Sequence, residues 1–232
     1  MAKASPTIVL VHGAWADGSS WNKVIPLLQS NGSRVIAVQI PLTSVEDDFA
    51  AARRIVEDTE GPIVLVGHSW GGVAVTQAGA NPKVVALVYI SAFAPDVGET
   101  GGSLIGAHAT PPALSTIVND KAGFVYQTED GMLQNVAPDI PADEARVLAV
   151  TQGRLAGAAF GQTVTEVAWK TKPSWYALTP EDRVVSPGLQ TMFAERMKAK
   201  ITILQASHMS LLSHPAKVAN VIEDAVAAVT AD

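Results

Sequence analysis

A serine flanked by glycines follows an apolar run in the first third of the chain. The run Pro62–Val66 is typical of a buried β-strand, because its residues are apolar and mostly β-branched. It leads into Gly67-His68-Ser69-Trp70-Gly71-Gly72, and a helix-like stretch over 73–80 follows. A G-x-S-x-G pattern between a strand and a helix is typical of a nucleophile elbow, a strained turn that exposes the serine Oγ above the sheet. The pattern predicts that Ser69 is the nucleophile of a serine hydrolase.

The glycines of this motif have distinct predicted roles. Gly67 and Gly71 lack Cβ atoms that would collide across so tight a turn. Gly72 lets the following helix approach the strands closely. We therefore expect this turn to pack tightly against its neighbours.

A serine hydroxyl is a weak nucleophile, so it needs a general base, and the base needs a carboxylate that orients it. In hydrolases with this elbow the acid and the histidine follow the serine in that order, each after a strand. Asp182 follows the strand-like run Ser174–Leu178, and His208 follows Ile201–Gln205. The order predicts a triad of Ser69, Asp182 and His208.

Two other carboxylates are alternatives for the acid. Glu181 is next to Asp182, and Asp96 follows the fourth strand-like run. Asp182 could also be a surface carboxylate paired with Arg183, an arrangement of little energetic value.

The remaining histidines have weaker claims to the role of base. His214 precedes a proline and suits the start of a helix, and His12 ends the first strand, where it shapes a turn. His68 precedes the nucleophile, so its side chain is expected to point away from the site. His108 is left without a role.

A tetrahedral intermediate needs two donors at its oxyanion. We predict the backbone N–H of Trp70, at the head of the elbow helix, and that of Ala14, in the loop after the first strand. The indoles of Trp15 and Trp70 either wall the pocket or belong to the core.

Six short apolar runs supply the strands that position these residues. Most are apolar at successive positions, as in parallel strands covered on both faces. Helical patterns alternate with them, which predicts an α/β fold with a mainly parallel six-stranded sheet in the order 2-1-3-4-5-6. The runs are Thr7–Val11, Arg34–Ile40, Pro62–Val66, Val84–Ser91, Ser174–Leu178 and Ile201–Gln205.

The helical pattern nearest the N-terminus contains a proline. Trp21, Val24, Ile25 and Leu28 have helical spacing, and Pro26 lies within them. We expect Pro26 to kink this helix rather than to break it.

One connection is far longer than a crossover requires. The 77 residues 96–172 contain helix-like pieces at Pro112–Val118 and Pro141–Thr151 and a loop-like piece at Gly98–Gly106. Long insertions usually carry function, so we expect a helical cap, or lid, over the strand ends. The predicted division is a hydrolase core of 1–95 and 173–232 and a cap of 96–172.

Composition limits the classes of function. The 232 residues are 48% hydrophobic and 16% charged, as in a packed globular enzyme, and the net charge of −6 without a basic cluster argues against nucleic acid as a partner. Cysteine is absent, which excludes disulfides and thiol catalysis.

Met1–Pro6 lacks the apolar stretch of a signal peptide, and no apolar run could span a membrane, so we expect a cytoplasmic location. These features are compatible with a homodimer.

The motifs together resemble a compact family of α/β-hydrolases. The resemblance rests on Val11–Trp15, the elbow Gly67–Gly72, Glu181-Asp182-Arg183 and Ser207–Leu212. The family includes plant methyl-salicylate and methyl-jasmonate esterases, hydroxynitrile lyases and small bacterial esterases. It implies the α/β-hydrolase fold, a helical cap and the same triad.

Within that family, two positions of this chain resemble the esterases. The lyases have threonine at the position of Gly13 and lysine at that of Met209, where the lysine stabilises the departing cyanide. We expect the substrate to contact Gly13 and Met209, and also Trp15 in the loop after the first strand. We expect hydrolysis of a small hydrophobic ester with neither metal nor organic cofactor. The alternatives are a hydroxynitrile lyase, a cofactor-free oxygenase and a small-molecule receptor.

Overall fold

The computed structural model describes residues 5–231 and contains a six-stranded sheet whose strand pairs are all parallel. Its strand order is β2-β1-β3-β4-β8-β9. Because β8 and β9 are the fifth and sixth strands of this sheet along the chain, this is the predicted order 2-1-3-4-5-6. The predicted fold class is confirmed. The strands are β1 (Thr7–Val11), β2 (Val35–Val38), β3 (Ile63–His68), β4 (Val84–Ile90), β8 (Ser174–Leu178) and β9 (Lys200–Ile203).

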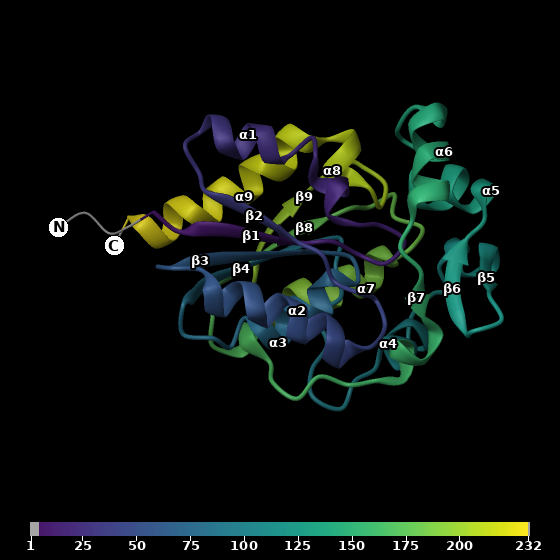
Figure 1. The fold of residues 1–232 in the computed structure, drawn as a ribbon, viewed down its shortest axis with the longest axis horizontal. Coiled ribbons are helices and arrows are strands. Elements are labelled where there is room, and N and C mark those ends of the chain that lie inside the picture. Colours follow the sequence, from purple (N-terminus) through teal and green to yellow (C-terminus); the bar gives the residue numbers. More distant parts are fainter. Residues whose placement is uncertain (1–4, 232) are drawn as a thin grey trace.

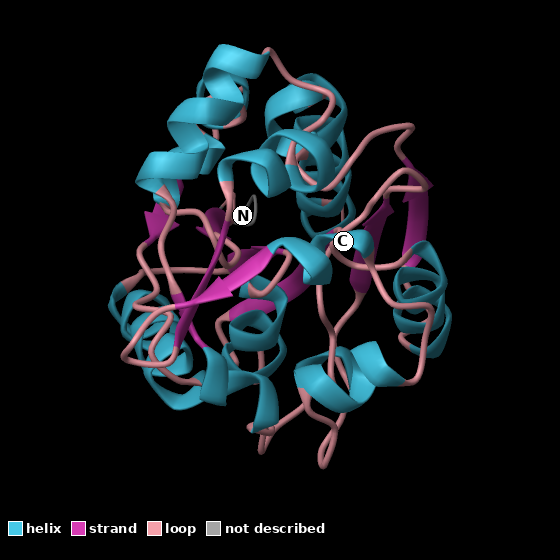
Figure 2. Cartoon of the chain, turned by 90° about the vertical axis from the view of Figure 1, so that its right-hand side faces the viewer, coloured by secondary structure: helices cyan, strands magenta, loops and turns pink. Residues whose placement is uncertain are grey.

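Helices cover both faces of this sheet, as Figures 1 and 2 show from two directions. Strands β1, β3 and β8 are buried along their whole length, which explains why their sequences are continuously apolar. On one face lie α1 (Ile25–Ser30), α8 (Ser210–Ser213) and α9 (Pro215–Thr230), and on the other lie α2 (Val45–Asp58), α3 (Gly71–Ala78) and α7 (Pro187–Arg196).

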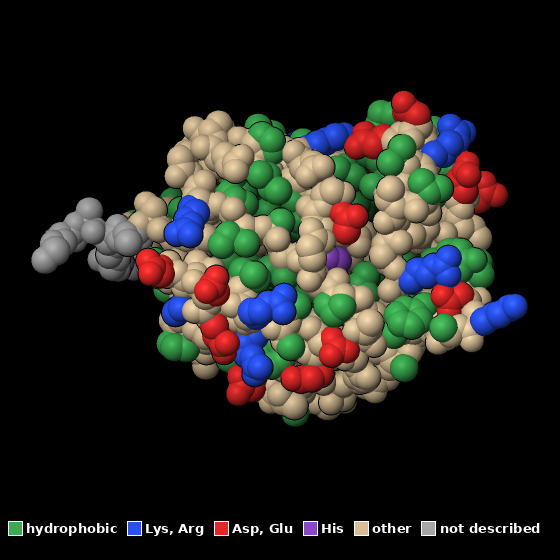
Figure 3. Space-filling view, viewed as in Figure 1, with side chains coloured by type: hydrophobic (Ala, Val, Ile, Leu, Met, Phe, Trp, Pro, Cys, Tyr) green, Lys and Arg blue, Asp and Glu red, His purple; other side chains and the backbone are tan. Residues whose placement is uncertain are grey.

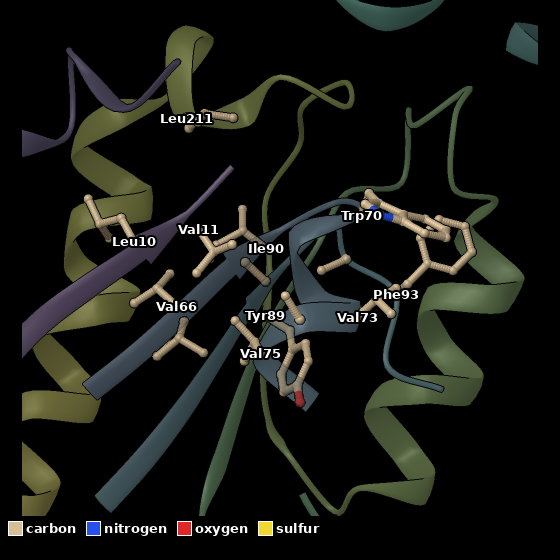
Figure 4. Close-up of a cluster of buried hydrophobic side chains, with 14 of the residues drawn as sticks. Leu10, Val11, Val66, Trp70, Val73, Val75, Tyr89, Ile90, Phe93 and Leu211 are labelled. Carbon is tan, nitrogen blue, oxygen red and sulfur yellow. The ribbon is translucent and has the colours of Figure 1, made fainter. Parts of the chain in front are cut away.

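The core between the sheet and α3 extends to the site. Figure 4 shows Val66 and Ile90 on the strands and Val73 and Val75 on α3, with Trp70 at the start of that helix. All of these side chains are buried. The elbow helix is therefore fixed to the strand that precedes it by close apolar packing.

Residues 96–172, here named the cap segment, lie between β4 and β8 at the carboxyl ends of the strands (Figure 1). They contain a three-stranded antiparallel sheet as well as helices. Its elements are α4 (Gly101–Gly106), β5 (Ile117–Asn119), β6 (Phe124–Gln127), α5 (Glu129–Gly131), α6 (Ala142–Thr151) and β7 (Leu155–Ala156), with short 3-10 or π turns between them.

Three local expectations were wrong. The piece 98–106, expected as a loop, contains α4, and the helix-like piece 112–118 is a 3-10 turn at Pro112–Thr116 followed by β5. Pro26 does not kink a longer helix, because a 3-10 turn at Gly18–Trp21 ends first and α1 begins at Ile25. Proline is favoured in the first turn of a helix, where its missing N–H would have no partner.

On the face shown in Figure 3, acidic and basic side chains are interspersed and form no large patch of one sign. None of the helices within residues 5–231 combines the length and the apolar character needed to cross a bilayer.

Candidate active site

Ser69 sits in a sharp turn between β3 and α3. Its φ of +52° lies in the left-handed region, which a serine adopts only when its surroundings impose it. A Cβ at Gly71 would overlap the carbonyl oxygens of Val11 and His12, and one at Gly72 would overlap the carbonyl oxygen of Phe93. The turn therefore requires glycine at both positions.

His208 and Asp182 are joined by a buried hydrogen bond. His208 Nδ1 donates to Asp182 Oδ2 over 2.8 Å, and both side chains are almost completely buried. The other carboxylate oxygen, Oδ1, accepts the backbone N–H groups of Val184 at 2.7 Å and Val185 at 2.9 Å. With its proton on Nδ1, the imidazole keeps Nε2 as a free acceptor.

Two further side chains hold the Asp182 carboxylate. Gln190 Nε2 donates to Oδ2 over 2.9 Å, and Thr179 Oγ1 lies 3.2 Å from the same oxygen. Because Oδ1 and Oδ2 are both occupied by donors, the carboxylate has a single orientation toward His208.

His68 brings the base and the elbow together. Its Nε2 donates to the backbone carbonyl of His208 over 2.9 Å, and the two imidazole centroids are 4.7 Å apart. Burial, and then the neighbouring His208, hold the pKa of His68 well below its ordinary value, so its ring is neutral. The expectation that this side chain points away from the site was wrong.

Within residues 5–231 no hydrogen bond joins Ser69 Oγ to His208.

A small chamber of about 20 Å³ lies beside Ser69. We name it the inner chamber, and its walls are almost entirely apolar. Gly13 and Met209 are not among these walls, although Gly13 lies directly against the Cβ of Ser69. The lining residues are Ala14, Trp15, Ser69, Trp70, Phe93, Ile105, Leu114, Leu155, Phe160 and Val184.

Two backbone donors at this chamber are free. In the part of the chain that the structure describes, the N–H groups of Ala14 and Trp70 have no hydrogen-bond acceptor. Both residues line the inner chamber together with Ser69. Their free amides are therefore available to an oxygen atom bound there.

The indole of Trp70 is held by a buried carboxylate. Its Nε1 donates to Asp48 Oδ2 over 3.0 Å, and the other oxygen of Asp48 accepts the N–H of Leu42 at 2.7 Å. The ring packs edge-on against Phe93, as Figure 4 shows, and against Phe160. Burial raises the pKa of Asp48 to about 6, despite these two donors.

This shift predicts how stability depends on pH. Between about pH 4 and pH 6 the folded protein binds a proton at Asp48 that the unfolded chain does not bind, so acidification stabilises the fold at this site. Going from about pH 7.5 to about pH 5 should therefore raise the free energy of unfolding of the wild type by about 1 kcal/mol relative to Asp48→Asn. Urea unfolding of both proteins at the two pH values measures the difference.

Asp47 offers a matched control. Its carboxylate is exposed, and hydrogen bonds from Ser44 and Thr43 lower its pKa. The difference in the free energy of unfolding between the wild type and Asp47→Asn should be the same at both pH values, because Asp47 stays ionised throughout. A constant difference between the wild type and Asp48→Asn would contradict the assignment.

The alternative acids lie elsewhere. Glu181 is exposed, and Asp96 forms an ion pair with Lys170 that lowers the pKa of Asp96. His12 is buried, and its Nε2 accepts the N–H of Ile40 at 3.1 Å, so it ties the loop after β1 to the end of β2. His214 immediately precedes α9.

The cap segment contacts each of the three loops that carry site residues. Trp15 donates its backbone N–H to Gly153 O over 3.0 Å. Arg183, next to Asp182, accepts the N–H of Ala113 at 3.0 Å. Ser207, next to His208, donates its N–H to Asp139 Oδ2 over 2.8 Å. The loops are thus held from the cap side as well as by the sheet.

Comparison with known proteins places this chain in a family. The model of the alpha/beta hydrolase family matches residues 8–221, nearly the whole chain. The chain belongs to the alpha/beta hydrolase family. A pyrethroid hydrolase from Sphingobium wenxiniae is 24% identical over 94% of this chain and 86% of its own, and Methylesterase 2 from Arabidopsis thaliana is 24% identical over 92% and 93%. The crystal structure of a pyrethroid hydrolase from Sphingobium faniae has a TM-score of 0.82 at 22% identity, covering 96% of this chain and 98% of that one.

In this alpha/beta hydrolase, sequence reasoning missed several residues around the site. Gln190 has a detectable signal, since it is an uncharged polar residue beside Leu189 on an apolar helical stripe. Asp48 has a weaker signal, since it lies at helical spacing from Val45 and Ala52 but follows Glu46 and Asp47 in an acidic run that suits a solvated helix start. Asp139 has none, because an acidic residue reads as a solvated side chain until its distant partners are known.

Proposed function

We propose that this chain is a serine carboxylic-ester hydrolase that acts on small hydrophobic esters. The observation that carries the proposal is the buried His208–Asp182 hydrogen bond beside the elbow that presents Ser69 to an apolar chamber. The names of the relatives, a pyrethroid hydrolase and a methylesterase, support the class of reaction. The apolar walls of the inner chamber support an uncharged substrate.

In the proposed reaction, Ser69 Oγ attacks the ester carbonyl carbon while His208 Nε2 accepts the hydroxyl proton. Asp182 keeps the proton of the imidazole on Nδ1 and stabilises the imidazolium that forms. The free amides of Ala14 and Trp70 donate to the oxyanion. His208 then protonates the departing alcohol, and the bond from the carbonyl carbon to that alcohol breaks.

Water completes the cycle. It attacks the acyl carbon and gives one proton to His208. As the tetrahedral intermediate collapses, the bond from that carbon to Ser69 Oγ breaks, His208 returns the proton to Oγ, and the carboxylic acid is released. Every step uses protein groups, the ester and water.

The lyase alternative needs a cation to stabilise cyanide as it leaves. The residue after His208 is Met209, which is buried and uncharged, so this position favours the esterase. A cofactor-free oxygenase or a receptor on the same fold would not need an activated serine.

Labelling by a fluorophosphonate tests the proposal. The reagent phosphonylates a serine only when a base activates it, so we expect one adduct, on Ser69, and loss of esterase activity in proportion to labelling. Peptide mapping by mass spectrometry locates the adduct. An unlabelled Ser69 in folded protein, or full esterase activity after complete labelling, would reject the proposal.

A further inference from the structure

A second cavity adjoins the inner chamber. It has a volume of about 670 Å³, and all of its lining residues belong to the cap segment. We name it the outer cavity. Ile105, Leu114 and Phe160 line both spaces, so these three side chains form the partition between them.

The two volumes assign different parts of a substrate to the two spaces. At about 20 Å³ the inner chamber has room for little more than one water-sized group, such as the methyl of an acetyl group. The outer cavity has the size usual for ligand sites. The bulk of any larger ester must therefore lie in the outer cavity, on the far side of the partition from Ser69.

The lining of the outer cavity selects an uncharged group. It contains no charged side chain, and its polar side chains are only those of Thr110 and Asn119. A charged group there would lose hydration without gaining an ionic partner. The aliphatic side chains and the ring of Phe160 suit an apolar group, such as a fused aromatic ring system.

The route to solvent indicates which part of the ester lies there. Residues Gly106, Asn119 and Ala158 of the outer cavity are exposed, whereas Ser69 and Trp70 are buried, so the outer cavity opens to solvent and shares a partition with the buried inner chamber. In a serine esterase the alcohol leaves first, and water then enters to attack the acyl group. An alcohol in the inner chamber would be trapped behind a bulky acyl group. An alcohol in the outer cavity departs freely and opens the path for water.

We propose that the outer cavity binds the alcohol part of the substrate, so that this enzyme prefers esters of a small acyl group with a bulky, uncharged apolar alcohol. This inference rests on the proposed function and adds the substrate class. Ile105, Leu114 and Phe160 are then the side chains between which the ester chain passes.

Two isomeric esters test the orientation. In 2-(1-naphthyl)ethyl acetate the bulk is in the alcohol, and in methyl 3-(1-naphthyl)propanoate it is in the acid, while the atoms and the ester type are the same. We expect kcat/KM for the acetate to exceed that for the propanoate by about tenfold or more. Equal values, or a preference for the propanoate, would overturn the inference.

Two cap glycines provide a matched pair of variants. Gly106 and Gly161 are both exposed, and a Cβ at either meets no atom within 4 Å, yet only Gly106 lines the outer cavity. Gly106→Trp should lower kcat/KM for 2-(1-naphthyl)ethyl acetate about tenfold more than it lowers kcat/KM for ethyl acetate, mainly through KM. Gly161→Trp should change neither.

The outcomes separate the two proposals. If Gly106→Trp lowers kcat/KM for both acetates equally, or for neither, the outer cavity is not the alcohol site, although the esterase proposal stands. If the wild type hydrolyses neither naphthyl ester nor ethyl acetate and fluorophosphonate leaves Ser69 unlabelled, the proposed function fails and this inference fails with it.

Discussion

Ser69→Ala should lower kcat for ester hydrolysis by about 10⁴-fold or more, with little change in KM or in the melting temperature. The variant removes the only atom that forms the acyl-enzyme, while the free amides of Ala14 and Trp70 and the apolar walls remain. Steady-state kinetics with an acetate ester and a thermal melt measure the two quantities.

Ser210→Ala is the matched control for this variant. Ser210 is also a buried serine, two residues after His208, and its Oγ has no hydrogen-bond partner among residues 5–231. Its replacement should change kcat by less than about threefold, because no bonded group is lost. A Ser69→Ala protein that keeps a tenth or more of the wild-type kcat would exclude the acyl-enzyme route and favour an oxygenase-like or receptor role.

Asp182→Asn should lower kcat by about 10³- to 10⁴-fold. The amides of Val184 and Val185 both donate to Oδ1, so the asparagine must keep its oxygen at that position. Its NH₂ group then faces His208 and donates to Nδ1. This reverses the hydrogen bond, places the imidazole proton on Nε2 and leaves no acceptor for the proton of Ser69.

Glu181→Gln and Asp96→Asn separate this acid from its neighbours. Glu181 is exposed and Asp96 is paired with Lys170, so each variant should keep kcat within about threefold of the wild type. A large loss in either variant, together with a small one in Asp182→Asn, would move the role of the acid. Thermal melts of all three variants distinguish loss of chemistry from loss of the fold.

The core could be predicted because its signals are local and repeated. The runs Thr7–Val11 and Ser174–Leu178 have the same bounds as β1 and β8, and the other four strands differ from their apolar runs by a few residues at the ends. Parallel strands buried on both faces need continuous apolar sequence, which periodicity reads directly. The strand order followed from the alternation of strands and helices, since it is the usual one for this arrangement.

The cap segment could be predicted only in its place and length. Strand β7 has two residues and β5 has three, which are too few for any period to register. The run Phe124–Gln127, which forms β6, does have aromatic and β-branched residues typical of a strand.

Helix α4 shows a different limit of sequence reasoning. Three of its six residues are glycine, so propensity favours a loop. The helix forms because Thr100 and Ser103 cap it reciprocally and because its own side chain Leu104 is buried. Capping and burial outweigh propensity there, and only the burial was hidden from the sequence.

For the site, sequence located the elbow, the histidine and the carboxylate because each follows a strand in a fixed order. It could not show that His68 lies against His208, since that contact joins residues 140 apart. Nor could it show that the indole of Trp70 is anchored by Asp48 on α2.

The hydrogen bonds from the cap segment to the loops of Trp15, Arg183 and Ser207 restrict how this enzyme can be remodelled. A cap segment that swung away as a rigid body would break all three hydrogen bonds at once and release these loops on that side. Grafting the corresponding domain from a relative would consequently alter how the reacting groups are supported, and not merely which molecules are admitted.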